Sequence, residues 1–217
     1  MDIPAEAAAF SAHPDLAQQL LPHAADSNDG SHDVAHLLRV YKNAMRIFEH
    51  EGGDGTVLAA AVLLHDCVAV EKTSPLRGQA SRLAAEKARG ILGPLGWTPA
   101  AIDQVAHAIH THSFSANIAP ETLEAKILQD ADRLDAIGMM GAARCFYSAG
   151  RMGSALYDPA DPLATHRPLD DKHYAIDHFA AKLFKLADGF QTAAGRALAR
   201  ERHERLKQVF ALFIDEI

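Results

Sequence analysis

The stretch Val57-Leu58-Ala59-Ala60-Ala61-Val62-Leu63-Leu64-His65-Asp66 decides how this chain is expected to fold. Its first eight residues are apolar without interruption, so a helix here is apolar on every side and should run through the centre of a domain. The run is far too short to span a membrane. It ends in an imidazole and a carboxylate, at positions where a protein core would favour leucine.

Helical periodicity continues on the N-terminal side of this stretch. Residues 52–55, Gly-Gly-Asp-Gly, are expected to form a turn that ends one helix, and Thr56 is expected to cap the next. The helix before the turn is expected to bury one face with the i, i+3, i+4, i+7 spacing. That face consists of Val34, Leu37, Leu38, Tyr41, Met45 and Phe48.

On the C-terminal side, a polar loop over 71–78 separates the central run from further predicted helices. One covers 80–92, another begins after Thr98 with Pro99 in its first turn, and another begins at Pro120. After a loop-like stretch over 150–171, two long helices are expected to complete the chain. Their apolar faces are Ile176, Phe179, Leu183, Leu186 and Phe190 in the first, and Leu206, Val209, Phe210, Phe213 and Ile217 in the second.

The pattern predicts an all-α fold, because no segment alternates between apolar and polar residues as a strand does. With 217 residues, of which 48% are hydrophobic and 23% charged, the chain has the composition of one globular domain. We expect a single helical bundle over 31–217. Residues 1–30 are expected to be an N-terminal segment with a short helix around Asp15–Leu21.

Charge and cysteine content narrow the functional class. Lys and Arg number 21 against 28 Asp and Glu, and no basic stripe appears, which argues against a protein that coats nucleic acids. A small anionic substrate is compatible, since a local pocket can be basic on an acidic surface. Cys67 and Cys145 lie among apolar neighbours and are expected to be buried, reduced thiols of a cytoplasmic protein. No signal peptide is recognisable, and the C-terminal apolar stripe fits either internal packing or a homodimer.

Three polar groups interrupt the apolar helix faces. The run 32–36, His-Asp-Val-Ala-His, opens the first core helix, His65-Asp66 closes the central run, and 130–135 reads Asp-Ala-Asp-Arg-Leu-Asp. Buried carboxylates without a partner are costly, and a bound divalent cation is the simplest partner that they can share. Imidazole and carboxylate donors without thiolate suit Mn²⁺, Mg²⁺, Fe²⁺, Ni²⁺ or Co²⁺ better than a structural zinc.

The order His36, His65-Asp66, Asp132 resembles the HD-domain metal-dependent phosphohydrolases. The resemblance implies an HD-type helical fold in which His36, His65, Asp66 and Asp132 hold a metal ion, and in which Asp66 or Asp132 orients the attacking water. Longer stretches resemble the YedJ/YpgQ-like bacterial branch of this family. They are His32-Asp33-x-x-His36-x-x-Arg39-Val40, Leu63-Leu64-His65-Asp66, His112-Ser113, the run 124–138, and Leu156-Tyr157-Asp158-Pro159.

The resemblance also indicates roles for residues near the ligand set. His112 is expected to act as an acid or phosphate contact, the alternative being a histidine that only ends its helix. Asp135 is expected to contact ribose or water, the alternative being a pair within its helix. Several further residues stay open: His32 and Asp33 either orient His36 or begin its helix, His107 and His110 are candidates for a second metal ion, and Asp130 is a weaker site candidate.

Three cations are candidates for binding substrate phosphates. Lys72 and Arg77 follow the His-Asp pair in the loop 71–78, where the alternative is a solvated loop, and Arg133 directly follows Asp132. The other histidines are expected to be surface or helix-packing residues. They are His166, His173, His178 and His203.

The sequence therefore predicts a metal-dependent phosphohydrolase that acts on a nucleotide or a similar small phosphoester. The resemblance to the YpgQ-like branch implies, more specifically, a nucleoside triphosphate pyrophosphohydrolase. A nucleoside monophosphatase or a phosphodiesterase is the alternative enzyme. A nucleotide-sensing HD module without turnover is the alternative of another class, although the intact ligand set favours an enzyme. No nucleic-acid polymer or membrane is expected as a partner.

Overall fold

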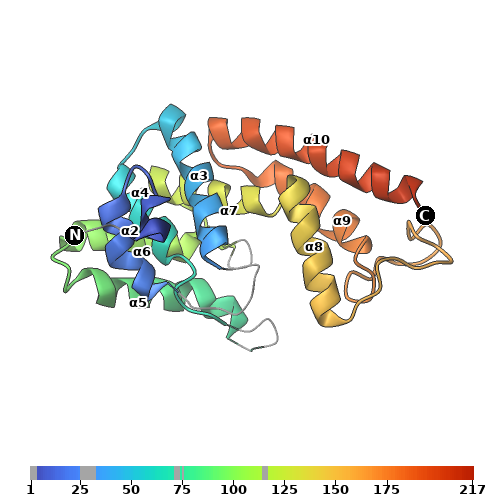
Figure 1. Ribbon diagram of the computed structural model, residues 1–217, viewed down its shortest axis with the longest axis horizontal. Helices are drawn as coiled ribbons and strands as arrows, with labels where there is room; N and C mark the ends of the chain where they lie inside the picture. The colour runs from blue at the N-terminus through green and yellow to red at the C-terminus, as the bar shows by residue number, and fades with distance from the viewer. Residues whose placement is uncertain (1–3, 25–32, 71–73, 75, 114–116) are drawn as a thin grey trace. The chain divides into compact units, whose positions relative to one another are not determined.

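The computed structural model describes residues 4–24, 33–70, 74, 76–113 and 117–217, and helices with connecting loops make up these ranges (Figure 1). The prediction of an all-α fold is confirmed: within these ranges the β contacts amount to one isolated bridge, between Ala155 and Tyr174. The chain divides into two compact units, Met1–Asp132 and Arg133–Ile217. None of the helices in the described ranges is both long enough and apolar enough to cross a bilayer.

Helix α4 (Gly55–Leu64) is the centre of the first unit, as predicted. Every residue from Val57 to Leu64 is buried, and α4 packs against α2, α3, α5 and α6. The prediction that Thr56 caps this helix is wrong, because Asp54 is the N-cap. Its carboxylate accepts the backbone N–H groups of Thr56 and Val57 at 2.9 and 3.0 Å, which satisfies two donors that a helix start leaves without partners.

Helix α3 (Val34–Glu51) ends at Gly52, as expected, but it buries a different face from the one predicted. Leu37 and Tyr41 are buried, whereas Val34 is 41% exposed and the other predicted residues are half-buried. The most deeply buried side includes the polar His36 and Asn43. Hydrophobic spacing alone misplaces this face, because it counts these two polar residues as solvent-facing.

The N-terminal segment contributes to the core of the first unit. Its helices are α1 (Ala5–Ala8), α2 (Pro14–Leu20) and the 3₁₀ turn η1 (Leu21–His23), and α2 packs on α4. Phe10 and Leu20 are fully buried, and the ring of Phe10 meets that of Tyr41 at 5.0 Å. The predicted boundary at residue 30 falls within 25–32, outside the described residues.

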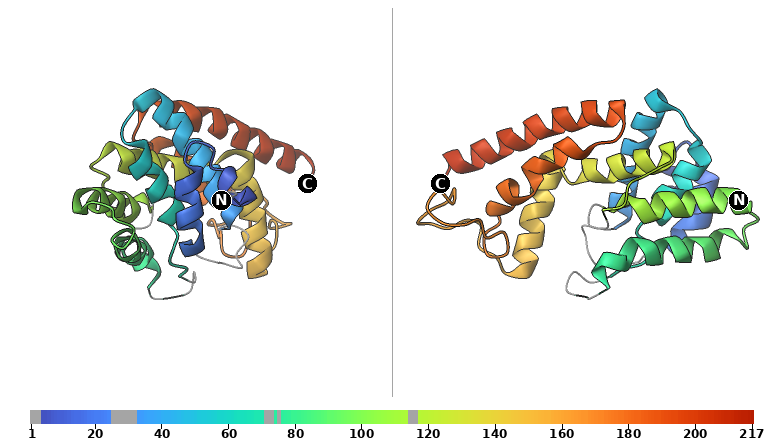
Figure 2. Two further views of the ribbon diagram at one scale, coloured as in Figure 1. Left: turned by 60° about the vertical axis from the view of Figure 1, so that its left-hand side comes forward. Right: turned by 180° about the vertical axis from the view of Figure 1, so that it is seen from behind.

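Helices α5 (Ala80–Leu92) and α6 (Pro99–His112) lie side by side, as both ribbon views show (Figures 1 and 2). Their predicted starts are confirmed, and the Thr98 hydroxyl caps α6 by accepting the N–H of Ala101. Helix α7 (Leu123–Asp135) begins three residues later than the predicted Pro120. The hydroxyl of Thr122 accepts the N–H of Ala125 at 3.2 Å, so Thr122 rather than Pro120 marks the helix start.

The second unit is built on α8 (Gly138–Met152) and α10 (Ala193–Asp215), which pack against each other. Gly138 has a φ of +73°, and a Cβ on Gly141 would lie 2.3 Å from the Ala136 carbonyl oxygen. Both positions therefore require glycine where α7 ends and α8 begins. The predicted loop at residue 150 starts later, because α8 continues to Met152.

The prediction of a long helix over 176–190 is wrong. The segment forms α9 (Asp177–Ala181) and the 3₁₀ helix η4 (Leu183–Gly189), separated by Lys182 with φ −136° and ψ −56°. The last helix, α10, is confirmed, but of its predicted face only Leu206 is fully buried. An aromatic cluster of the second unit joins Phe179 to Phe146 and Phe210, with ring centroids 5.9 and 5.4 Å apart.

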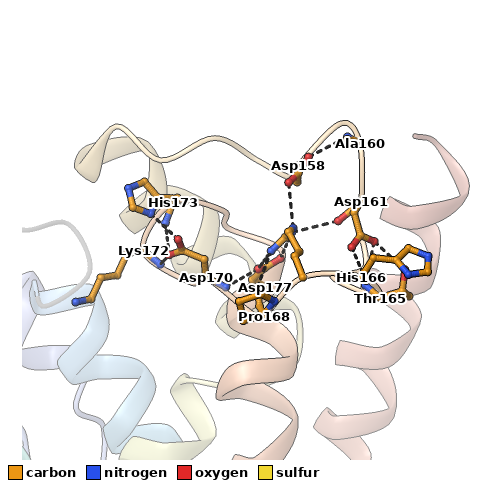
Figure 3. Close-up of polar contacts among 11 residues, drawn as sticks. Asp158, Ala160, Asp161, Thr165, His166, Pro168, Asp170, Lys172, His173 and Asp177 are labelled. Atoms are coloured by element: carbon orange, nitrogen blue, oxygen red, sulfur yellow. Dashed lines mark hydrogen bonds and ion pairs between the residues drawn. The ribbon is translucent and has the colours of Figure 1, made fainter.

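Polar contacts cross-link the loop between α8 and α9, and several of them end on Asp158, Asp161 and Asp177 (Figure 3). Arg167 donates to both carboxylate oxygens of the buried Asp177, to the carbonyl oxygen of Asp161, and pairs with Asp158. Its charge also lies over the ring of Tyr174, 4.5 Å from the centroid. These contacts tie distant parts of a long loop to one another.

Candidate metal centre

Two imidazoles and two carboxylates of the first unit lie together: His36, His65 and Asp66 place ligand atoms within 4.8 Å of one another, and Asp132 adjoins this group at His36. The Nε2 atoms of His36 and His65 are 3.3 Å apart. His36 Nε2 also lies 3.7 Å from Asp66 Oδ2 and 3.6 Å from Asp132 Oδ1, and His65 Nε2 lies 3.6 Å from Asp66 Oδ2. The imidazoles are fully buried, whereas the side chains of Asp66 and Asp132 are 31% and 26% exposed. The four groups predicted from the sequence are thus brought together by α3, the end of α4, and α7.

The backbone sets the orientation of these imidazoles. Asp33 caps α3 by accepting the N–H of His36 at 2.9 Å, so this carboxylate anchors the first turn of the helix that carries His36. His65 stands at the C-cap of α4, and its Nδ1 donates to the carbonyl oxygen of Val62 at 2.7 Å. A carbonyl can only accept, so the proton is on Nδ1 and the lone pair of Nε2 points at the cluster.

His112 is held beside the cluster in the same way. Its Nδ1 donates to the Ile109 carbonyl at 2.6 Å, its Nε2 lies 3.8 Å from Asp66 Oδ1, and its ring meets that of His65 edge-on at 4.9 Å. Burial, and then the nearby imidazole of His65, lower the pKa of His112 against the opposing pull of the carboxylates of Asp132 and Asp66. The ring is therefore neutral at pH 7, with an Nε2 lone pair beside Asp66.

Two buried amides were missed in the sequence. Asn43 Nδ2 donates to the carbonyl oxygen of Ala131 at 3.1 Å, and Gln129 Nε2 donates to that of Thr111 at 2.8 Å. Single amides on a helix look like surface residues. The available signal was their spacing, since Asn43 follows His36 by seven residues and Gln129 precedes Asp132 by three, which puts each on the side of its helix that faces the site.

Two predicted site residues engage partners within the second unit. Asp135 is buried, and its Oδ2 accepts from Arg144 Nη1 at 2.9 Å. Arg133 donates to the carbonyl oxygen of Gly189. Lys72 and His32 lie outside the described residues, as does the side chain of Arg77, whose backbone begins the 3₁₀ turn η2 (Arg77–Gln79).

Of the remaining polar candidates, His107 has a local hydrogen-bond partner. His107 Nε2 accepts the N–H of Glu121 at 3.1 Å, which occupies the lone pair that a metal ion would need. Asp130 is fully buried, and His110 is half-buried. The four outlying histidines are exposed or half-buried, as expected: His166, His173, His178 and His203.

Both cysteines are buried free thiols, as predicted, and burial raises the pKa of Cys67 and of Cys145 to about 11. Both thiols are therefore protonated at neutral pH, which makes them weak nucleophiles.

Comparisons with known proteins agree with this geometry. The profile of the HD domain family matches residues 34–137. The uncharacterized protein YpgQ of Bacillus subtilis (strain 168) is 36% identical over 187 residues, which cover 84% of this chain and 82% of YpgQ.

Solved structures show the same fold. A crystal structure of B. subtilis YpgQ superimposes with a TM-score of 0.71 at 32% identity, covering 94% of this chain and 96% of YpgQ. An HD-superfamily hydrolase from Bacillus thuringiensis gives 0.70 at 32% identity, covering 93% and 96%. YpgQ in complex with ADP gives 0.69 at 32% identity, covering 98% and 95%.

Proposed function

Because the chain belongs to the HD-domain family of metal-dependent phosphohydrolases, we propose that it hydrolyses a phosphoester or phosphoanhydride bond of a nucleotide. The observation that carries the proposal is that His65 Nε2, Asp66 Oδ2 and Asp132 Oδ1 all lie within 3.7 Å of His36 Nε2. The nucleotide class is supported by YpgQ, which is 32% identical to this chain and was crystallised with ADP.

The side chains of His36, His65, Asp66 and Asp132 fit a divalent cation. At 3.3 Å, the two Nε2 atoms share either one proton or a cation, and two carboxylates beside them favour the cation. Four protein donors leave coordination positions open for water and substrate in an octahedral ion such as Mn²⁺ or Mg²⁺. A bound divalent ion supplies charge neutralisation at phosphorus and a water of lowered pKa.

The residues of the chain position the reactants. Asp66 and Asp132 keep part of their carboxylate surface in solvent, so their oxygens can accept hydrogen bonds from an attacking water and orient it. In the resting state His112 is neutral, with its Nε2 lone pair next to Asp66. During the reaction it accepts a proton from water or substrate. It returns that proton as an acid to the leaving group or to phosphate.

Cations supply the phosphate contacts. Lys72 and Arg77 are proposed to bind phosphoryl oxygens, because both belong to the loop 71–78 that comes after the His-Asp pair in the chain. Arg133 and Asp135 are proposed as further substrate contacts. In the structure Arg133 donates to the carbonyl oxygen of Gly189, and Asp135 accepts from Arg144.

The bond proposed to break is the one that releases pyrophosphate from a nucleoside triphosphate. The test uses protein stripped of metal, supplied with nucleoside mono-, di- and triphosphates and a dinucleotide phosphodiester, with and without Mn²⁺. We expect turnover only with added metal and pyrophosphate from the triphosphate. Phosphate from the monophosphate, or cleavage of the diester, would instead assign the alternative enzyme classes. Bound metal without turnover on any substrate would indicate a nucleotide sensor.

The phosphate contacts are tested by kinetics of Lys72→Ala and Arg77→Ala. Loss of one charge-assisted contact, about 1.5–3 kcal/mol, should lower kcat/KM roughly ten- to a hundredfold, and more for triphosphates than for monophosphates. Lys207→Ala is the matched control, since Lys207 is a surface cation paired with Glu204. Equal values for all three variants would show that the loop 71–78 only carries solvated charges.

A further inference from the structure

We propose that Asn43 and Gln129 are positioning residues that set the places of Asp132 and His112 through the backbone. The inference rests on the proposed function, because it assigns the two amides to the same site. Each amide donates to the carbonyl of the residue that directly precedes a site residue: Ala131 before Asp132, and Thr111 before His112.

Asn43 couples α3 to α7. Seven residues make nearly two full helical turns, so Asn43 lies on the same side of α3 as His36. It is 5% exposed, and its Nδ2 donates to the Ala131 carbonyl at 3.1 Å. The next residue of α7, Asp132, then places Oδ1 3.6 Å from His36 Nε2. One face of α3 therefore carries the proposed metal ligand His36 and also holds α7, which carries Asp132. The contact of Asn43 fixes the position of α7 along its axis and its rotation about that axis.

Gln129 couples α7 to α6. It precedes Asp132 by three residues, which puts both on one side of α7. It is 2% exposed, and its Nε2 donates to the Thr111 carbonyl at 2.8 Å. That carbonyl is in the last turn of α6, where the helix offers no N–H of its own. Gln129 supplies the hydrogen-bond donor that the Thr111 carbonyl lacks within its own helix. It thereby fixes the backbone from which the His112 side chain extends.

Amides suit this task because of their chemistry. An amide N–H carries no charge at any pH, so it holds a backbone carbonyl without competing for the cation or adding to the negative charge of the cluster. The two amides act on different targets, and this separates their expected effects. Loss of Asn43 should displace the proposed metal ligand Asp132. Loss of Gln129 should displace His112, which is not one of the four proposed metal ligands.

The test compares Asn43→Leu and Gln129→Met, which keep side-chain size and remove the donor. Mn²⁺ affinity is measured by titration of the metal-free protein, and kcat and KM are measured at increasing Mn²⁺. Asn43→Leu should bind Mn²⁺ roughly ten- to a hundredfold more weakly, as loss of a group that orients a metal ligand does elsewhere. Excess Mn²⁺ should restore much of its kcat. Gln129→Met should keep its Mn²⁺ affinity and lose kcat at every Mn²⁺ concentration.

The control is Ile47→Ala, a fully buried side chain one turn beyond Asn43 on α3. It should lower the melting temperature without changing Mn²⁺ affinity. If Asn43→Leu does not fold, Asn43→Ser replaces it, with the same expected loss because the hydroxyl is too short to span the contact.

Unchanged Mn²⁺ affinity in the Asn43 variant, with normal binding by the wild-type protein, would overturn this inference alone. Equal loss of affinity in the Asn43, Gln129 and Ile47 variants would also overturn it, by assigning the effect to general destabilisation. A wild-type protein that binds no divalent metal would contradict the proposed function itself.

Discussion

Replacing Asp132 by Asn should have opposite effects on stability with and without metal. The carboxylates of Asp66 and Asp132 both lie within 3.7 Å of His36 Nε2. Their contacting oxygens are therefore at most about 7 Å apart, where two unit charges repel by about 2 kcal/mol at an effective dielectric constant of 20. Partial exposure screens this repulsion to about 1 kcal/mol. Without metal, Asp132→Asn should stabilise the protein by about that amount.

With metal bound, the wild-type protein should instead be more stable than Asp132→Asn. A ligand at a hundred times its dissociation constant stabilises the folded state by about 2.7 kcal/mol, and the variant should lose most of this. The assay is urea unfolding at pH 8, where an ordinary imidazole is neutral, in EDTA and in Mn²⁺.

The matched control for this assay is Asp103→Asn. Asp103 is an exposed carboxylate paired with Arg89, so its replacement should shift stability equally in EDTA and in Mn²⁺. The reasoning would be refuted if Asp132→Asn lay below wild type in EDTA, or gained as much as wild type from Mn²⁺.

Three further outcomes are expected. Because burial and the imidazole of His65 lower the pKa of His112, the stability from its neutral form is complete above the unfolded value of about 6.5 and is lost as pH falls through the folded pKa. In EDTA, His112→Gln should flatten the decline of melting temperature between pH 6.5 and 5, and a parallel decline would contradict this. Arg167→Ala should lower the melting temperature, since it leaves the buried Asp177 without its guanidinium partner. Arg167→Lys should recover only part of this loss. Equal melting temperatures for Arg167→Ala and the wild-type protein would count against the cross-link. Leu63→Ala should cost about 2–5 kcal/mol in urea unfolding, and a loss below 1 kcal/mol would show that α4 is not the centre of the core.

The sequence was most informative at α4, where an uninterrupted apolar run ends in two polar residues. An unbroken apolar run can only be buried, so the central place of α4 followed from composition alone, and His65-Asp66 at its end was visible as an interruption. The same logic misplaced the buried face of α3, because His36 and Asn43 are polar and still face inward. A functional core contains polar residues, and hydrophobic spacing counts them on the solvent side.

Other features depend on contacts that no local pattern reveals. The interruption at Lys182 between α9 and η4 has no proline or glycine to announce it. The partners of Asp135 and Arg133, namely Arg144 and the carbonyl of Gly189, are separated from them by 9 and 56 residues. Such pairs are set by packing within the second unit, so the sequence could name the charged residues but not their partners.

The central claim is that four side chains of the first unit hold the divalent ion on which phosphoester hydrolysis depends. The most direct measurement is anomalous X-ray scattering from crystals of the protein grown with Mn²⁺. We predict an anomalous peak within bonding distance of His36 Nε2, His65 Nε2 and carboxylate oxygens of Asp66 and Asp132. Full Mn²⁺ occupancy at another place in the chain, with no peak at these four residues, would contradict the account.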